Sequence, residues 1–203
     1  MYRNLVVIFA LLLLSGCRLV SEKQLADLKN PPNPHMADIK KTWQQQIVPQ
    51  IEKEARPAQV LLQDLQSAGS FDEACKKYGY RSQEESPCNF YVTITGTVEK
   101  INTASRSGKM IIKDDQGNSY TVQIGPIIRG TTLRDAYRGA SYQDFNDQVL
   151  FGDYGKEINQ QAADMLKDIK PAGGNKISVT GVFSSWDIPQ TLPDVTPAKV
   201  NKS

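Results

Sequence analysis

The hydrophobic pattern of this chain changes its period at Cys88, and this change limits the fold more than any other feature. Directly after Cys88, every second residue from Phe90 to Val98 is apolar or glycine, which is the pattern of a strand buried on one face. Before it, apolar residues recur at the three- to four-residue spacing of amphipathic helices: Ile39, Trp43, Ile47, Ile51, Ala55, Ala58, Leu62 and Leu65. The chain therefore places helices before a sheet.

We expect the helical part to span residues 35–88, and prolines and glycines divide it. Pro49 and Pro57 each lack a backbone donor and clash with the preceding turn, so breaks or new first turns are expected there. The stretch from Ser70 to Glu73 has the pattern of a capping box, and Gly79 is the expected end of the helix that it opens.

Further strands are predicted over residues 109–113 and 119–124, joined by turn residues 114–118, and over residues 177–183 and 195–200. Gly96, in the middle of the first strand, predicts a bulge or a sharp bend. Between the third and fourth strands, apolar residues at helical spacing predict a long helix that ends at residues 171–174: Tyr154, Ile158, Ala162, Met165 and Ile169.

Three strands, a helix and two strands follow one another in the order of an OB-type barrel. We therefore predict an α+β fold with N-terminal helices and a five-stranded OB-like β-barrel over residues 89–203, carrying a helical insert between strands 3 and 4. A β-sandwich would need more strands. Tyr91 is the single aromatic residue on the predicted outer face of the first strand, whereas nucleic-acid binding needs stacking aromatics in a basic groove. We expect no nucleic-acid partner.

The first seventeen residues have the organisation of a secretory signal: Arg3, an apolar run from Leu5 to Leu14, and small residues before Cys17. Ten residues rise about 15 Å as a helix, against roughly 30 Å of hydrocarbon in a bilayer, so a retained membrane span is not expected. We assign residues 1–16 to a signal peptide. The end of this segment resembles the lipobox of bacterial lipoproteins; an ordinary signal followed by a chance cysteine is the alternative.

The lipobox resemblance implies that Cys17 becomes the mature N-terminus and carries a diacylglycerol and an N-acyl chain of the palmitate type. Two or more acyl chains anchor a protein stably in a membrane. Arg18, rather than Asp, follows the cysteine, which within the lipoprotein class favours the outer membrane as the destination on the periplasmic side. Residues 17–34 are polar and end in a proline-rich stretch, so we expect an extended tether.

After removal of residues 1–16, 23 basic residues face 22 acidic ones, so the mature charge of +1 gives no broad field for polyanions. The two remaining cysteines, Cys75 and Cys88, predict a disulfide in this oxidising compartment. Two free thiols are the alternative. They lack the CxxC spacing, and His35 is the single histidine, so no metal site and no cofactor are expected.

The densest group of chemically versatile residues lies at residues 125–135. Two glycines, two arginines and two threonines there suit a concave site in which backbone N–H groups and guanidinium groups hold an anion or the hydroxyls of a sugar. In the alternative interpretation, Arg129, Arg134 and Asp135 pair with each other or with local carbonyls and fix a long crossover. Gly130 would then merely permit an unusual backbone angle.

The string Gly-Pro-Ile-Ile-Arg-Gly-Thr-Thr-Leu-Arg-Asp at 125–135, followed by Asp-Phe-Asn-Asp-Gln at 144–148, resembles the predicted periplasmic lipoproteins of the DUF2291 family. Asp147 departs from the asparagine expected there. Family members often lie beside sugar ABC-transporter genes, which implies an accessory role in sugar uptake. The expected partners are a transporter component or a small sugar or anionic ligand, and the candidate ligand-binding residues are Arg129, Thr131, Thr132, Arg134, Asp135 and Gln148.

Catalytic motifs are missing from the sequence. It has no GxSxG, no Walker-type loop and no GxGxxG, and a catalytic triad would have to recruit His35 from the tether end. We therefore expect a non-catalytic binding or accessory protein without catalytic residues. The alternative is an enzyme acting on envelope carbohydrate through two of Asp135, Asp144 and Asp147, which requires carboxyl groups about 5–10 Å apart.

Overall fold

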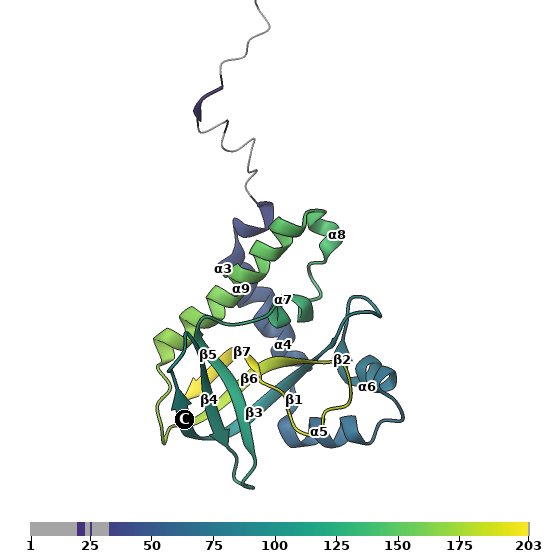
Figure 1. Ribbon diagram of the computed structural model, residues 1–203, viewed down its shortest axis with the longest axis vertical. Coiled ribbons are helices and arrows are strands. Elements are labelled where there is room, and N and C mark those ends of the chain that lie inside the picture. Colours follow the sequence, from purple (N-terminus) through teal and green to yellow (C-terminus); the bar gives the residue numbers. More distant parts are fainter. Residues whose placement is uncertain (1–19, 23–24, 26–32, 203) are drawn as a thin grey trace, which may run out of the picture. The chain divides into compact units, whose positions relative to one another are not determined.

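A computed structural model describes residues 20–22, 25 and 33–202 of the chain (Figure 1). Contacts within the chain divide it into two units, residues 1–34 and residues 35–203, and the elements described below belong to the second unit. The predicted signal peptide and the predicted lipidation site Cys17 lie outside the described residues. None of the helices in the described part of the chain has the length and apolarity that crossing a bilayer requires.

Before the sheet, residues 39–54 form one continuous helix that contains a π-helical turn, and two shorter helices follow it. Pro49 has no N–H to donate, and its ring crowds the preceding turn. The chain meets this with a π-helical turn, in which the N–H of Val48 donates to the carbonyl of Trp43 five residues earlier. The predicted break at Pro49 is thus a widened turn. The elements are η2 (Pro34–Met36), α3 (Ile39–Thr42), η3 (Trp43–Ile47), α4 (Val48–Glu54), α5 (Ala58–Gln66) and α6 (Phe71–Tyr78).

The sheet is antiparallel and curled, apart from one short parallel pair. Its long strands follow the order β5-β4-β3-β6-β7, and the backbone of Val195 closes part of the remaining gap by bonding to Thr121 and Gln123 of β5. Two-residue strands β1 and β2 pair with β3, so the described sheet has seven strands where the sequence predicted five. The bounds are β1 (Arg56–Pro57), β2 (Gly79–Tyr80), β3 (Cys88–Asn102), β4 (Ser107–Lys113), β5 (Ser119–Pro126), β6 (Lys176–Ser185) and β7 (Thr196–Lys202).

The bend predicted at Gly96 lies where β3 changes its neighbours. A Cβ on Gly96 would stand 2.3 Å from the carbonyl oxygen of Lys113, so only glycine allows β4 to approach β3 this closely. The register of the two strands shifts between Val98 and Lys100, which is the signature of a bulge. β3 can therefore pair with β6 along its first part and with β4 along its last part.

Three helices lie between β5 and β6: α7 (Thr132–Ala136), α8 (Tyr142–Phe145) and α9 (Gln148–Ile169). The carboxylate of Asp147 caps α9 by accepting hydrogen bonds from the N–H groups of Val149 and Leu150. α9 packs across β5 and β7 (Figure 1). Its buried face follows the predicted stripe at Tyr154, Ile158 and Ala162, and continues to Leu166.

The N-terminal helices share one core with the sheet, since Ile51, Leu61 and Leu65 are fully buried together with Phe90. This packing overturns the expected exposure of Tyr91. The Tyr91 side chain is only 1 % exposed, because α4 and the chain after α7 cover the outer face of β3. Its hydroxyl donates to the carbonyl of Ala136 at 2.7 Å, and burial raises its pKa to about 12.

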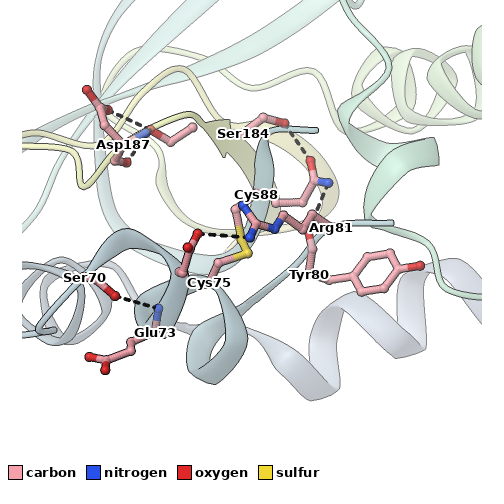
Figure 2. Close-up of a disulfide and its surroundings, with 11 residues drawn as sticks. Ser70, Glu73, Cys75, Tyr80, Arg81, Cys88, Ser184 and Asp187 are labelled. Carbon is pink, nitrogen blue, oxygen red and sulfur yellow. Dashed lines mark hydrogen bonds and ion pairs between the residues drawn. A yellow bond between two sulfur atoms is a disulfide. The ribbon is translucent and has the colours of Figure 1, made fainter. Parts of the chain in front are cut away.

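A disulfide joins Cys75 of α6 to Cys88 at the start of β3, as the sequence predicted (Figure 2). The Ser70 hydroxyl accepts a hydrogen bond from the N–H of Glu73, so the predicted cap opens α6, and α6 ends directly before Gly79. In Figure 2 the Tyr80 ring points away from the disulfide. The disulfide thus fixes both ends of the loop between α6 and β3.

Removal of this disulfide is expected to destabilise the protein. Changing both Cys75 and Cys88 to Ala frees a loop of 13 residues in sequence separation and lowers the free energy of unfolding by about 3 kcal/mol in the chain-entropy model. Urea unfolding followed by circular dichroism measures the loss. Dithiothreitol should destabilise the wild type but leave the double variant unchanged; equal sensitivity of both proteins would contradict a structural disulfide.

Asp114 organises the predicted turn between β4 and β5. Its carboxylate accepts hydrogen bonds from the N–H groups of Gln116 and Asn118 and from the Tyr120 hydroxyl, at 2.8–2.9 Å. The side-chain amides of Asn118 and of Gln59 in α5 add bonds at 3.1 and 2.8 Å. Partial burial by itself would raise the pKa of Asp114, but these hydrogen bonds outweigh it and lower the pKa to about 2.

The low pKa of Asp114 predicts a pH-dependent contribution to stability. Since the folded value lies below the unfolded value of about 3.9, the contribution is complete above roughly pH 4 and is lost as the pH falls towards 2. Asp114→Ala should cost about 1–2 kcal/mol at pH 7, and the difference from the wild type should shrink towards pH 2. Urea unfolding at several pH values tests this, with Asp115→Ala as the control. A pH-independent difference would refute it.

Candidate functional site

A pocket of about 680 Å³ lies where the disulfide loop meets α7, α8 and the start of α9. We refer to it as the α7–α9 pocket. Segments far apart in the sequence build its wall, and Arg134 and Asp135 are the charged residues among its lining. The other lining residues are aromatic, hydroxyl-bearing, carboxamide or small: Tyr80, Ser82, Gln83, Ser86, Pro87, Asn89, Tyr137, Ala140, Ser141, Tyr142, Gln143, Gln148, Phe151 and Gly152.

Arg134 donates three hydrogen bonds within the protein. Its Nε and Nη2 donate to Oδ1 of Asp135 at 2.8 and 2.6 Å, and its Nη1 donates to the carbonyl of Phe151 at 3.2 Å. The guanidinium carbon lies 3.8 Å from the centroid of the Phe151 ring, and the side chain is 13 % exposed. Arg134 therefore fastens α7 to α9 through an ion pair, a hydrogen bond and a cation–π contact.

Thr131 and Gly155 accommodate the Arg134–Asp135 pair. Thr131 donates its hydroxyl hydrogen to Oδ2 of Asp135 at 2.5 Å, so both carboxylate oxygens have partners. Gly155 of α9 leaves room for the arginine, because a Cβ there would lie 3.3 Å from Arg134 Cδ. Of the two interpretations of the 125–135 segment, these contacts support the structural one for Thr131, Arg134 and Asp135.

Arg129 lies away from the α7–α9 pocket. Its backbone N–H donates to the side chain of Gln123, and its Nε donates to the hydroxyl of Ser107 at 2.5 Å. Gly130 has a φ of +80°, so this glycine does provide the unusual backbone angle. Asn159 of α9, which sequence reasoning missed, donates to the carbonyls of Ile128 and Gly130 and holds the segment against the helix.

Two candidate residues remain: Thr132, which does not line the pocket, and Gln148, which does. Thr132 contacts the hydroxyl of Ser184 at 3.2 Å, and Ser184 donates to Oδ1 of Asn89, a pocket residue, at 2.7 Å. Gln148 lines the pocket directly from the first turn of α9. Arg134, Asp135 and Gln148 thus meet in one cavity, Thr131 and Thr132 support its wall, and Arg129 belongs elsewhere.

The three carboxylates of the enzyme hypothesis each have a structural role. Asp135 pairs with Arg134. Asp144 accepts hydrogen bonds from the N–H and hydroxyl of Ser141 at 2.7 and 2.9 Å, which hold its pKa below the usual value, the reverse of what a general acid needs. Asp147 caps α9. Within the described residues, no group of histidine, cysteine and carboxylate side chains has a metal-binding arrangement.

Aromatic side chains form the part of the pocket that sequence reasoning missed. Phe151 contacts the ring of Tyr142 edge-on, at 5.9 Å between centroids, and Tyr142 itself is 43 % exposed. Tyr137 donates its hydroxyl hydrogen to Gln46 of η3, and burial raises its pKa. Gly139 is required beside it, because a Cβ there would overlap the Tyr137 hydroxyl.

Trp186 lies on the surface, at the turn that follows β6. Its side chain is 67 % exposed, directly after the end of β6. The turn is held by Ser185, whose hydroxyl donates to the carbonyl of Asp187 at 2.7 Å.

Comparisons with known proteins identify a family for this chain and an OB-fold protein of similar structure. The family model described as "Predicted periplasmic lipoprotein (DUF2291)" matches residues 7–201. A crystal structure of an OB-fold protein from Thermotoga maritima superposes with a TM-score of 0.61 at 13 % identity, over 81 % of this chain and 96 % of that chain. OBody AM3L09, bound to hen egg-white lysozyme, reaches a TM-score of 0.28 at 12 % identity, over 56 % and 80 % of the two chains. A search of curated proteins finds no match.

Proposed function

The chain belongs to the DUF2291 family of predicted periplasmic lipoproteins, and we propose that it is a lipid-anchored binding protein without catalytic activity. The single observation that carries the proposal is the α7–α9 pocket, because a concave site of about 680 Å³ with polar and aromatic walls is typical of small-molecule binding. The ligand would be a small sugar or an anion, and the partner a component of a sugar ABC transporter. The gene context of the family supports this partner.

The anchor in this proposal is Cys17, acylated after removal of residues 1–16. Residues 17–34 would then be the tether, and residues 35–88 and 89–203 the helical and barrel parts of the folded body. At up to about 3.4 Å per extended residue, the tether would keep the first residue of the folded body within roughly 60 Å of the bilayer. Arg18 after the cysteine favours the outer membrane within the periplasm.

We further infer that the five long strands act as an OB-like barrel and that α7, α8 and α9 are a helical insert between its third and fourth strands. The insert, together with the disulfide loop, supplies most of the pocket wall. Binding would thus depend on segments added to the barrel, in the same way that many folds carry their sites on inserted loops.

The enzyme alternative has no specific observation in its favour. Asp135, Asp144 and Asp147 serve as an ion-pair partner and as helix caps, so each would have to give up a structural role to act on a glycosidic bond. We therefore retain binding as the proposed function.

Loss of the anchoring thiol provides the first test. Cys17→Ala should move the protein from the membrane fraction to the soluble fraction, because the acyl chains that hold it in the bilayer are no longer attached. Fractionation followed by immunoblotting measures this, and Cys75→Ala with Cys88→Ala serves as the control for cysteine loss as such. Continued membrane association of Cys17→Ala would contradict lipidation at this residue.

Ligand binding in the pocket provides the second test. Gly152 lines the pocket, and a Cβ there would meet no atom within 4 Å, so Gly152→Ala should fold normally and Gly152→Phe should fill the cavity. A periplasmic small-molecule extract should raise the melting temperature of the full-length protein. A ligand at a hundredfold excess over its Kd stabilises by about 2.7 kcal/mol. Gly152→Ala should keep this stabilisation and Gly152→Phe should lose it; the same shift in both variants would place the ligand elsewhere.

A further inference from the structure

We propose that the α7–α9 pocket selects an uncharged, hydroxyl-rich ring, a neutral saccharide, and discriminates against anions. This inference rests on the proposed function, because it assumes that the pocket binds a small ligand. The sequence left two ligand classes open, a small sugar and an anion. The lining side chains that make no hydrogen bond to another described residue favour the sugar.

The lining of the α7–α9 pocket has no net formal charge. An anion site needs a cation whose N–H groups are free to donate, yet three of the five N–H groups of Arg134 already donate to Asp135 or to the carbonyl of Phe151. The Phe151 ring also covers one face of the guanidinium group. Since Arg134 and Asp135 are the charged residues of the lining and neutralise each other, the wall has no net formal charge. An anion entering it would lose hydration and would have to compete with the Asp135 carboxylate for the guanidinium group.

The polar side chains of the lining that remain available to a ligand are uncharged. The Asn89 amide donates to the carbonyl of Tyr80 and accepts from Ser184, and the Ser141 hydroxyl donates to Asp144, so these groups are also engaged. Several other lining residues have no side-chain hydrogen bond to another described residue: Ser82, Gln83, Ser86, Gln143 and Gln148. All of them are uncharged hydroxyls or carboxamides, which both donate and accept. Ligand hydroxyl groups have the same dual character.

Tyr142 gives the pocket an aromatic surface on which a ring can pack. Tyr142 lines the pocket with 43 % of its surface exposed, and its edge-to-face contact with Phe151 fixes the orientation of its ring. A sugar ring presents an apolar C–H surface together with peripheral hydroxyls, so it can pack on an aromatic side chain while the hydroxyls bond to the surrounding amides. Tyr142 in α8 and Gln148 in α9 are therefore the residues that we assign to ring packing and hydroxyl recognition.

The test separates the extract by charge before adding it to the full-length protein. An anion-exchange resin divides the periplasmic extract into a neutral flow-through and an anionic eluate. The neutral fraction should raise the melting temperature of the wild type, and periodate, which cleaves vicinal diols, should abolish this effect. Stabilisation by the anionic eluate, or a neutral activity that resists periodate, would overturn the saccharide assignment while leaving the binding function intact. Stabilisation by neither fraction would refute both.

Matched variants connect the effect to the assigned residues. Gln148→Ala and Tyr142→Ala should each weaken binding of the neutral fraction roughly fivefold or more, measured as the dilution of extract that gives half of the full shift. Val149→Ala is the control, because Val149 follows Gln148 directly, is 70 % exposed and does not line the pocket. Equal effects of Gln148→Ala and Val149→Ala would refute the assignment, and the melting temperature without extract reports whether each variant is folded.

Discussion

The fold of this protein depends on the pairing of β3 with its neighbours, because β3 contacts almost every other part of the sheet. β6 runs along ten of its residues, β4 joins beyond Gly96, and the short strands β1 and β2 fill the edge before that glycine. The disulfide at Cys88 ties the same strand to α6. One long bent strand thus brings the N-terminal helices, the barrel strands and the disulfide loop into a single core.

The chemistry of the site follows from how charge is distributed around this core. Burying a guanidinium group is costly unless it is paired, and three N–H groups of Arg134 donate inside the protein, to Asp135 and to the Phe151 carbonyl. The residues that look most reactive in the sequence therefore hold α7 on α9. In the proposed binding site, ligand recognition would fall to uncharged side chains such as Gln148.

The sequence predicted most of the regular elements because each of them buries one face with a clear period, as β3 and α9 do. It could not predict β1 and β2, since two-residue strands have no period, nor the burial of Tyr91, since its cover comes from α4, about forty residues away. For the pocket it identified Arg134, Asp135 and Gln148, but it left open whether Arg134 and Asp135 hold a ligand or pair with each other. The opposite wall comes from the loop between α6 and β3, and only the folded chain brings that loop to α7.

Most of the pocket wall comes from segments outside the long strands, so a similar fold gives no information about what the pocket binds. The Thermotoga maritima OB-fold protein shares 13 % of its residues with this chain, a level at which strand order persists while surface chemistry changes freely. From the sheet, Asn89 of β3 enters the pocket wall and Ser184 of β6 fixes the Asn89 amide. The remaining wall belongs to the disulfide loop and to the α7–α9 segment. In the proposed binding protein, ligand specificity would therefore depend mainly on these segments, with Asn89 as the contribution of β3.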